Sequence, residues 1–429
     1  MPTVLAVSRY FPPAGPAGAS IRIVKLLKYA AQTGAVQTDA VQTGWSFVVL
    51  TQDPDRPVIR EEKQSAFLLE ELPAGTRVER VAAPFFDGPG WLRRLWGDSS
   101  LPWGVRTFWR GLGCLRRGQI DLVYANTPPF SNVAAAAALS WLARVPLVVD
   151  FKDDWVGSTR YLQKGKFRRR IEAAIEAAIV RRARAVCVVT RHSYAEYRRR
   201  YAAGGLADKI HWIPNGQDMD EFRLLFDRPR RIETQRFTLL SAAAGYRPDY
   251  RDLSPLLDGL GAFLRRCPEA RQEIELVFLG EDPHATYLRR LQDMGLGAAL
   301  HLAGGQDRRS LVEWLWKADL FFLVQPRGNR TAISGTLYEY WATGKAPTLL
   351  IAEPGASSAL VMDHHFGQHV PFDQPEAAAA YLEQASRAYR AGRPLWVERA
   401  GVEQYDRRAI VEHMLACFRQ AITPGEGGA

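Results

Sequence analysis

Residues 331–345 read TAISGTLYEYWATGK. The pattern predicts a short apolar helix that opens after a Ser-Gly-Thr stretch, ends at Gly344-Lys345 and carries one carboxylate, Glu339. Free backbone N–H groups at the start of such a helix attract phosphate oxygens. A Glu one turn further in can accept hydrogen bonds from ribose hydroxyls. The stretch therefore suits a nucleoside diphosphate, although an ordinary amphipathic helix with a solvated Glu fits the same residues.

Short β-branched runs alternate with helical patterns along the chain, which is the signature of parallel α/β sheets. The first series of expected strands is Val4–Val7, Phe47–Thr51, Arg77–Ala82, Asp121–Tyr124, Leu147–Phe151, Ala185–Thr190 and Ile210–Ile213. The second series is Phe237–Ser241, Ile274–Leu279, Ala299–Leu302, Leu320–Val324 and Thr348–Ile351. A final helix is expected over about Arg407–Ile422, where it could pack across either half.

The simplest account is two α/β domains, at residues 1–225 and 226–405, followed by a C-terminal helix and tail at 406–429. In open parallel sheets, ligands bind outside the carboxyl ends of the strands. With two such sheets, we expect the site in a cleft between them. The odd stretch at residues 32–44 repeats Ala-Val-Gln-Thr and is interpreted as a surface loop insertion.

The composition is that of a globular protein: the chain has 429 residues, of which 47% are hydrophobic and 24% charged. The cysteines Cys114, Cys187, Cys267 and Cys417 are scattered, so we interpret them as buried small hydrophobes in a reducing compartment. No basic region precedes the first apolar run, and no run approaches the length of a transmembrane helix. These features predict a cytoplasmic protein.

The net charge of +10 has four candidate explanations: nucleic acid, an anionic membrane, a phosphorylated substrate, or simply an Arg-rich composition. Trp and Arg interleave from Phe85 to Trp96 and on through Trp103 and Trp109, and Lys and Arg are dense at residues 164–170. Trp favours membrane interfaces, and basic residues favour anionic lipid. Since no nucleic-acid motif is present, we expect peripheral binding at the inner face of the membrane and no nucleic acid; core packing of these tryptophans is the alternative.

In the N-terminal half, the loop from Tyr10 to Ser20 would let the backbone approach a ligand at Gly15 and Gly18. It lacks the pattern of a phosphate-binding loop, so a substrate-facing loop and a plain turn stay open. Asp150, Lys152 and Asp153 end an expected strand, and Lys152 would keep its neighbouring carboxylates ionised. Asp153 is therefore a candidate base or orienting group. We interpret the charge cluster as functional, because Asp150 would otherwise be half-buried without a purpose. The alternative is a solvated strand exit.

In the C-terminal half, Arg247 and Arg251 follow a strand and could neutralise a diphosphate without a metal. Strand-to-glycine loops at Gly245, Gly280 and Gly304, the last with Gln306, could clasp a base through backbone groups. The pair Asp218 and Asp220 has the D-x-D form of some metal sites. We interpret it as a loop with a helix cap and not as a metal site.

Together these parts resemble the GT-B glycosyltransferases of family 4. The matching pieces run in the family's order: Tyr10-Phe11-Pro12-Pro13, Asp121-Leu122-Val123-Tyr124, Asp150-Phe151-Lys152-Asp153, Ile213-Pro214-Asn215-Gly216-Gln217-Asp218, Ala318-Asp319-Leu320 and Leu337-Tyr338-Glu339-Tyr340 with Gly344-Lys345. The resemblance implies metal-independent transfer of a sugar from a nucleotide donor, with retained anomeric configuration and no cofactor. It also implies a C-terminal domain that binds the donor and an N-terminal domain that binds a glycan, lipid-linked or secondary-metabolite acceptor.

The resemblance assigns roles residue by residue. Glu339 becomes the ribose ligand, Ser334, Gly335 and Thr336 the diphosphate cradle, and Arg247 or Arg251 the diphosphate cation. The remaining donor contacts are Gly245, Gly280, Gly304 and Gln306, and the acceptor contacts are Gly15, Gly18, Asn126, Asp150 and Asp153. Asp153, Lys152 and Arg247 are the expected catalytic residues. Thr331 and Thr336 stand where relatives often carry Glu and Lys, so a nucleotide-sugar-binding pseudo-transferase is one alternative; a nucleotide-sugar epimerase of the same fold is another.

Overall fold

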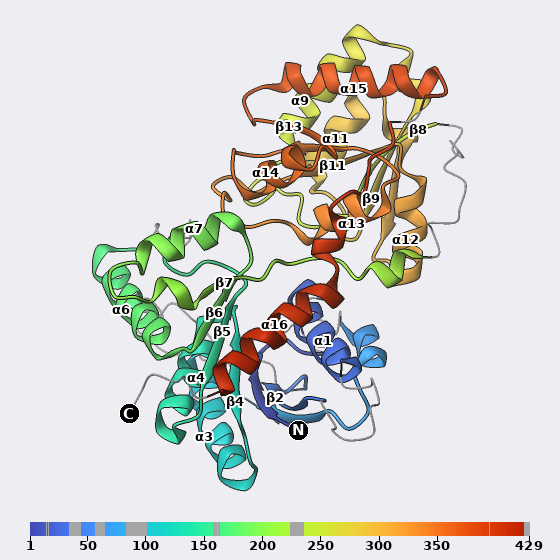
Figure 1. Cartoon of the computed structure of the whole chain (residues 1–429). Coiled ribbons are helices and arrows are strands. Elements are labelled where there is room, and N and C mark those ends of the chain that lie inside the picture. Colours follow the sequence, from blue (N-terminus) through green and yellow to red (C-terminus); the bar gives the residue numbers. More distant parts are fainter. Residues whose placement is uncertain are drawn as a thin grey trace. The chain divides into compact units, whose positions relative to one another are not determined.

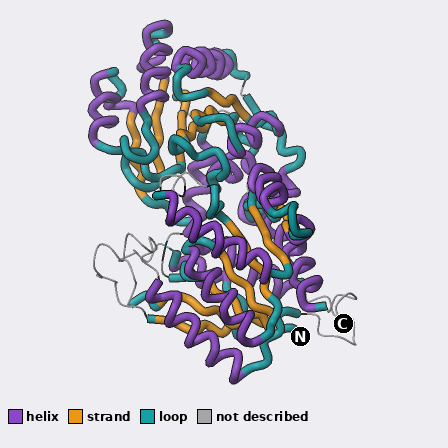
Figure 2. The backbone as a smooth tube through the Cα atoms, turned by 90° about the vertical axis from the view of Figure 1, so that its left-hand side faces the viewer, coloured by secondary structure: helices purple, strands orange, loops and turns teal. Residues whose placement is uncertain are grey.

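The computed structural model describes residues 1–13, 15, 17–33, 44–55, 65–82, 101–157, 161, 164–223, 236–393 and 395–423. These residues form two compact units, one made of Met1–Asn215 with Arg407–Ala429 and the other of Gly216–Asp406. The repeat at 32–44 lies almost wholly outside the described residues, and the aromatic stretch Phe85–Trp96 lies wholly outside them. Figures 1 and 2 show strands flanked by helices in each unit.

The first unit contains a seven-stranded parallel sheet in the order β3-β2-β1-β4-β5-β6-β7. Its strands are β1 (Thr3–Val7), β2 (Ser46–Gln52), β3 (Arg77–Val81), β4 (Leu122–Asn126), β5 (Leu147–Phe151), β6 (Ala185–Val188) and β7 (Ile210–Trp212). Its helices are α1 (Ala17–Gln32), α3 (Leu101–Arg117), α4 (Phe130–Ala143), α6 (Lys166–Arg182), α7 (Arg191–Arg200) and α16 (Arg407–Ile422), with short 3-10 turns η1 (Ala66–Glu71) and η2 (Ala207–Lys209).

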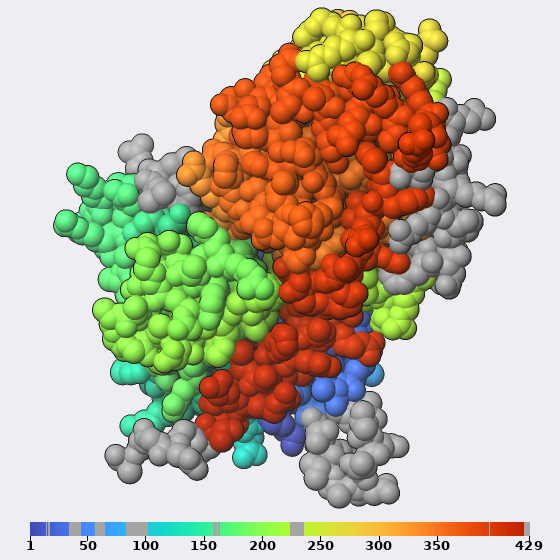
Figure 3. Space-filling view, turned by 45° about the horizontal axis from the view of Figure 1, so that its top comes forward, coloured from blue at the N-terminus to red at the C-terminus, as the bar shows by residue number. Residues whose placement is uncertain are grey.

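Successive side chains of these strands point to opposite faces, so the first unit has two cores. Leu5 and Val7 pack under α3, α4, α6 and α7 on one face. Val4 and Ala6 pack under α1 and α16 on the other. The last helix therefore returns to the first unit and completes its second layer, as Figure 3 shows in red. Its predicted bounds are confirmed, and of the two halves left open it packs on the N-terminal one.

The second unit contains a six-stranded parallel sheet in the order β10-β9-β8-β11-β12-β13. Its strands are β8 (Phe237–Ser241), β9 (Ile274–Leu279), β10 (Leu300–Gly304), β11 (Leu320–Val324), β12 (Thr348–Ile351) and β13 (Gly367–Val370). Its helices are α9 (Ser254–Arg266), α10 (Ala270–Glu273), α11 (Ala285–Asp293), α12 (Arg308–Lys317), α13 (Gly335–Thr343), α14 (Ala356–Asp363) and α15 (Pro375–Arg390), with 3-10 turns η3 (Met219–Phe222), η4 (Gly297–Ala299) and η5 (Val402–Tyr405).

The predicted fold class, two doubly wound parallel α/β sheets, is confirmed. One edge strand, β13, was not predicted, because its sequence Gly-Gln-His-Val carries a single large apolar residue. Glycine is nevertheless required at position 367 for steric reasons. A Cβ atom at this position would lie 2.1 Å from the carbonyl oxygen of Thr348 on the neighbouring strand.

Candidate functional site

In the second unit, β8 and β11 are neighbours in the sheet, although β9 and β10 lie between them in the chain. The order reverses here, with β9 on the outer side of β8 and β12 on the outer side of β11. In doubly wound sheets, ligands bind beyond the carboxyl ends of the strands at such a switch point. The loops that follow β8 and β11 carry Arg247, Arg251 and the Ser334–Thr336 segment.

The segment predicted to cradle a diphosphate forms the start of α13. Ser334 occupies the N-cap position with extended backbone, and its side chain makes no capping hydrogen bond. A Cβ atom on Gly335 would meet no other atom within 4 Å, so there is open space beside the first residue of this helix. Since the first N–H groups of a helix have no partner within it, α13 presents backbone donors to that space.

The loop ahead of α13 is held by a chain of amide and hydroxyl hydrogen bonds. Gln325 donates from Nε2 to Ser357 Oγ at 2.6 Å, and Asn329 donates from Nδ2 to Gln325 Oε1 at 2.8 Å. Asn329 in turn accepts from the N–H of Ala332 at 3.2 Å, and Ser357 donates to the carbonyl of Ala332 at 3.1 Å. These bonds fix the approach of the backbone to the helix start.

Glu339, one turn into α13, is half-buried and paired with an arginine that the sequence did not single out. Arg308, the first residue of α12, donates from Nη1 to Glu339 Oε1 at 2.6 Å. Its Nε donates to Glu221. Burial alone would lower the pKa of Arg308, but Glu339 and Glu221 raise it above its usual value. The pairing orients the Glu339 carboxylate.

The loop after β8 is tied to α13 through Tyr340. The N–H of Ala242 donates to Tyr340 Oη at 2.8 Å. Gly245 has φ of 80°, in the region that favours glycine. Arg251 donates to the carbonyl of Ala244 at 3.2 Å, whereas Arg247 is exposed and pairs with Asp249 at 3.2 Å. Of the two candidate diphosphate cations, Arg251 is thus the one anchored to the loop.

The glycines after β9 and β10 lie against each other. The N–H of Gly280 donates to the carbonyl of Gly304 at 2.6 Å, and both residues have positive φ, at 98° and 68°. The side chain of Gln306 donates back to the carbonyl of Ala303 at 2.6 Å. Gln306 therefore uses its amide nitrogen to close its own loop.

In the first unit, Asp150 lies in a buried network. Its carboxylate accepts two hydrogen bonds from Arg22, at 2.7 and 3.0 Å, and one from Tyr124 Oη at 2.8 Å. Arg22 also donates to the carbonyls of Ile213 and Pro214. Asp150 is fully buried, and through Arg22 it joins α1, β5 and the segment after β7, which gives it a structural role in this unit.

Two further predicted residues lie at the carboxyl ends of β4 and β5, which are adjacent strands. Lys152 is buried and donates from Nζ to the carbonyl of Ala19 at the start of α1, at 2.8 Å. Burial lowers the pKa of Lys152 to about 8, against the opposing effect of Asp150 and Asp153. Asn126 is buried at the end of β4, and its carbonyl accepts from Asn132 at 3.0 Å.

The loop after β1 carries the two predicted acceptor glycines. Gly15 is buried with φ of 85°, a conformation that other residues rarely adopt. A Cβ atom on Gly18 would meet no other atom within 4 Å, so packing within the described part of the protein does not require glycine there.

Asp153 is exposed in a turn that two buried glutamates of α6 hold in place. Trp155 donates from Nε1 to Glu172 Oε2 at 3.1 Å, and the N–H of Val156 donates to Glu176 Oε2 at 2.9 Å. Glu176 is further fixed by Arg200 at 2.9 Å. The exposed carboxylate therefore stands on a rigid support, which is what a group that acts on a substrate needs.

The interpretation of the D-x-D pair as a helix cap is confirmed for Asp218. Its side chain accepts from the N–H of Asp220 at 3.1 Å and caps the 3-10 turn η3. Asp220 pairs with Arg223 at 3.0 Å.

Comparisons with known proteins agree with this architecture. The family model for the glycosyl transferase 4-like domain matches residues 31–216. The phosphatidyl-myo-inositol mannosyltransferase of Mycobacterium tuberculosis is 23% identical over 335 residues, which cover 76% of this chain and 81% of the relative.

Solved structures share the fold over nearly the whole chain. HepE of Anabaena in complex with UDP superposes with a TM-score of 0.66 at 15% identity, covering 98% of this chain and all (100%) of HepE. WaaG, a glycosyltransferase involved in lipopolysaccharide biosynthesis, gives a TM-score of 0.65 at 16% identity, covering 99% and 100% of the two chains.

Proposed function

Because this chain belongs to the GT-B glycosyltransferases of family 4, we propose that it transfers a sugar from a nucleoside diphosphate sugar to a glycan or lipid-linked acceptor. The observation that carries the donor assignment is the open start of α13 at the switch point of the second sheet, with Glu339 one turn further in. A helix start attracts the diphosphate, and the carboxylate accepts from the ribose hydroxyls. HepE, which shares the fold, has been solved with UDP.

In the proposed reaction, the bond between the sugar C1 and the diphosphate oxygen breaks and a bond from C1 to an acceptor oxygen forms, with retained configuration. The leaving diphosphate gains negative charge, which Arg251, Arg247 and the N–H groups of α13 would stabilise without a metal. An assay in EDTA tests this part: unchanged turnover supports it, whereas loss restored by Mg²⁺ or Mn²⁺ would assign a metal to carboxylates such as Asp218.

The acceptor side of the proposal rests on the first unit. Asp153 is exposed and rigidly supported, so it can accept the proton that the acceptor hydroxyl loses. Lys152, buried behind it, would supply positive charge while its ammonium is protonated. Asn126, Gly15 and Gly18 follow the neighbouring strands and would contact the acceptor; Asp150 acts indirectly, by holding the frame through Arg22.

We also propose that the acceptor is presented by an anionic membrane. Large apolar side chains stand exposed on the outer helices of one sheet face: Trp109 of α3 is 64% exposed, Trp141 of α4 73%, and Phe167 of α6 73%. Trp103, by contrast, is fully buried, which agrees with the alternative interpretation that these tryptophans pack in the core. Basic residues accompany the exposed ones, with Arg106 and Arg110 on α3 and Lys166, Arg169 and Arg170 on α6.

This surface combines interfacial aromatics with cations, the composition that binds anionic lipid surfaces. None of the described helices combines the length and apolar composition of a bilayer-spanning segment. The relative from Mycobacterium tuberculosis is named for mannosyl transfer to phosphatidyl-myo-inositol, a lipid, which supports an acceptor of this class.

A nucleotide-sugar panel tests the proposed function. A donor present at about 100 times its Kd should stabilise the protein by about 2.7 kcal/mol, which thermal unfolding detects. The stabilising donor is then incubated with protein and membrane lipid extract, and the labelled sugar is followed. Transfer to lipid or glycan supports the proposal. A new epimer of the donor would identify an epimerase, and binding without turnover would identify a pseudo-transferase.

A further inference from the structure

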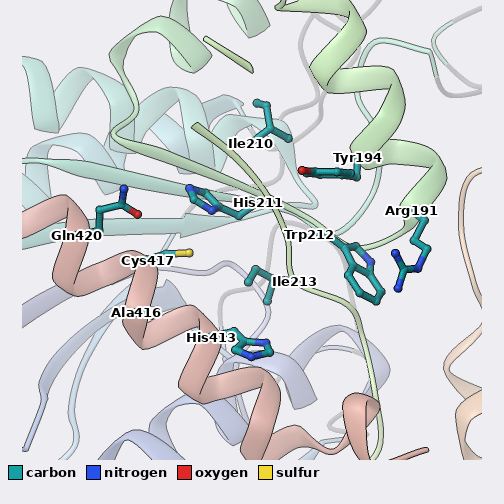
Figure 4. A pocket seen from close by; sticks show the side chains of 10 residues that line it. All are labelled: Arg191, Tyr194, Ile210, His211, Trp212, Ile213, His413, Ala416, Cys417 and Gln420. Carbon is teal, nitrogen blue, oxygen red and sulfur yellow. The ribbon is translucent and has the colours of Figure 1, made fainter. Parts of the chain in front are cut away.

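The first unit contains a pocket away from the residues discussed so far. It has a volume of about 490 Å³ and lies between α7, the edge strand β7 and α16. Figure 4 shows His211 of β7 and Cys417 of α16 on the walls of the same pocket, with His413 about one turn before Cys417 on α16. Arg191 closes another side, stacked on Trp212 with its guanidinium carbon 4.0 Å from the ring centroid.

A second cysteine lies behind this wall. Cys187 of β6 is the register partner of His211 on β7, and both are within reach of α16. The Cys187 Sγ atom lies 3.6 Å from the Sδ atom of Met414, one turn before Cys417 on the same helix. Cys187, Met414 and Cys417 belong to the same buried cluster, and Cys187 and His211 are close enough to Cys417 to influence its ionisation. The prediction of buried cysteines is confirmed for Cys114, Cys187 and Cys417, while Cys267 is half-buried.

The surroundings of the two thiols differ. Interaction with Cys187, and then with His211, lowers the pKa of Cys417 below that of an ordinary thiol. Interaction with Cys417, together with burial, raises the pKa of Cys187. Interaction with Cys417 also raises the pKa of His211. Of the two thiols, the one that lines the pocket is therefore the one whose ionisation is favoured.

We propose that Cys417, which lines this pocket together with His211, is a peroxide-reactive nucleophile, and that Cys187 is its resolving thiol. The Cys417 sulfur attacks a hydroperoxide: an S–O bond forms, the O–O bond breaks, and the leaving oxygen takes a proton from His211. The Cys187 sulfur then attacks the resulting sulfenic acid. An S–S bond forms, the S–O bond breaks, and the departing hydroxide takes the Cys187 proton as water. Two thiols are oxidised, and one hydroperoxide is reduced to an alcohol and water.

The other cysteines provide matched internal controls. Cys267 is more exposed than Cys417, which has an exposed fraction of only 5%. Cys114 is buried, and its pKa is raised by burial. If access alone decided reactivity, Cys267 would react first; if the thiolate decides it, Cys417 reacts first.

The first experiment labels the full-length protein with iodoacetamide at pH 6 and follows each cysteine by peptide mass spectrometry. An ordinary thiol with a pKa of about 8.5 is only about 0.3% thiolate at this pH. We expect alkylation of Cys417 at least about tenfold faster than that of Cys267. Equal or faster labelling of Cys267 would overturn the proposal.

The second experiment treats the protein with hydrogen peroxide and maps peptides without reduction. We expect a Cys187–Cys417 cross-linked peptide in the wild type. In Cys187→Ser, we expect sulfenic acid at Cys417, trapped by dimedone. Cys267→Ser serves as the control and should leave the cross-link unchanged. Oxidation spread evenly over the cysteines, or none at Cys417, would contradict the assignment, and the wild-type result decides even if a variant fails to fold.

Discussion

Arg308 donates from Nη1 to Oε1 of Glu339 at 2.6 Å, and this contact joins the start of α12 to the first turns of α13. The two residues are 31 positions apart in the chain. Arg308 is also bonded to Glu221, so the guanidinium is held between two carboxylates. The carboxylate that we assign to the ribose is therefore positioned by a neighbouring cation before any donor arrives.

Replacing Arg308 by Gln should weaken donor binding, because Glu339 would lose the group that orients it. A half-buried charge that loses its partner costs about 1–3 kcal/mol, which corresponds to about 5- to 150-fold in donor Kd. Titration calorimetry with the donor measures the effect. The exposed neighbour Arg309 supplies the control Arg309→Gln, which should bind as the wild type does. Wild-type affinity in a folded Arg308 variant would show that the pair does not serve the donor.

The pKa of Lys152, lowered to about 8 by burial, predicts how turnover depends on pH. A lowered pKa means that the ammonium loses its proton at a lower pH than usual. If its positive charge serves the reaction, kcat/KM should fall as pH rises through about 8. In Lys152→Arg this decline should disappear, since arginine stays protonated. A decline that persists unchanged in the variant would assign it to another group.

Asp153→Asn should lower turnover far more than donor affinity. A general base contributes typically about 10²–10⁴-fold, while the donor contacts lie in the other unit. The exposed Asp293 at the end of α11 gives the control Asp293→Asn. A fall in kcat of less than about fivefold would show that Asp153 has only a structural role in the turn.

Membrane binding should depend on the exposed aromatics. The double variant Trp109→Ala, Trp141→Ala should float less with anionic vesicles than the wild type, because each side chain loses its contact with the interface. Met362→Ala, which removes an exposed apolar side chain from the other unit, is the control. Equal flotation with neutral and anionic vesicles, or none with either at low salt, would reject the membrane proposal.

Local sequence patterns were enough to predict these helices and strands. The bounds of α16 and of β5, β8, β9, β11 and β12 follow from their apolar runs, which the sheets bury. Local patterns could not predict contacts between residues that are far apart in the chain. Arg22 and Asp150 are 128 positions apart, so the buried pair that explains Asp150 leaves no local pattern. Arg308 has many arginines around it in the sequence, and only its contact with Glu339 distinguishes it.

The same reason applies to the cysteines. Cys187 ends up beside Cys417 because α16 returns to the first sheet, and the spacing of 230 residues contains no hint of this. Spacing motifs reveal thiol pairs only when both members lie on one local element.

The central claim is that this chain binds a nucleotide sugar through Glu339. The most direct test compares the donor Kd of the wild type with that of Glu339→Gln, with Glu403→Gln, an exposed carboxylate of the same unit, as control. A carboxylate bonds hydroxyls more strongly than an amide does, and we expect a loss in the range of charged hydrogen bonds, about 1.5–3 kcal/mol. We predict a Kd raised about 10- to 150-fold in Glu339→Gln and unchanged in the control. A Kd within twofold of the wild type, in a folded Glu339→Gln protein, would contradict the claim.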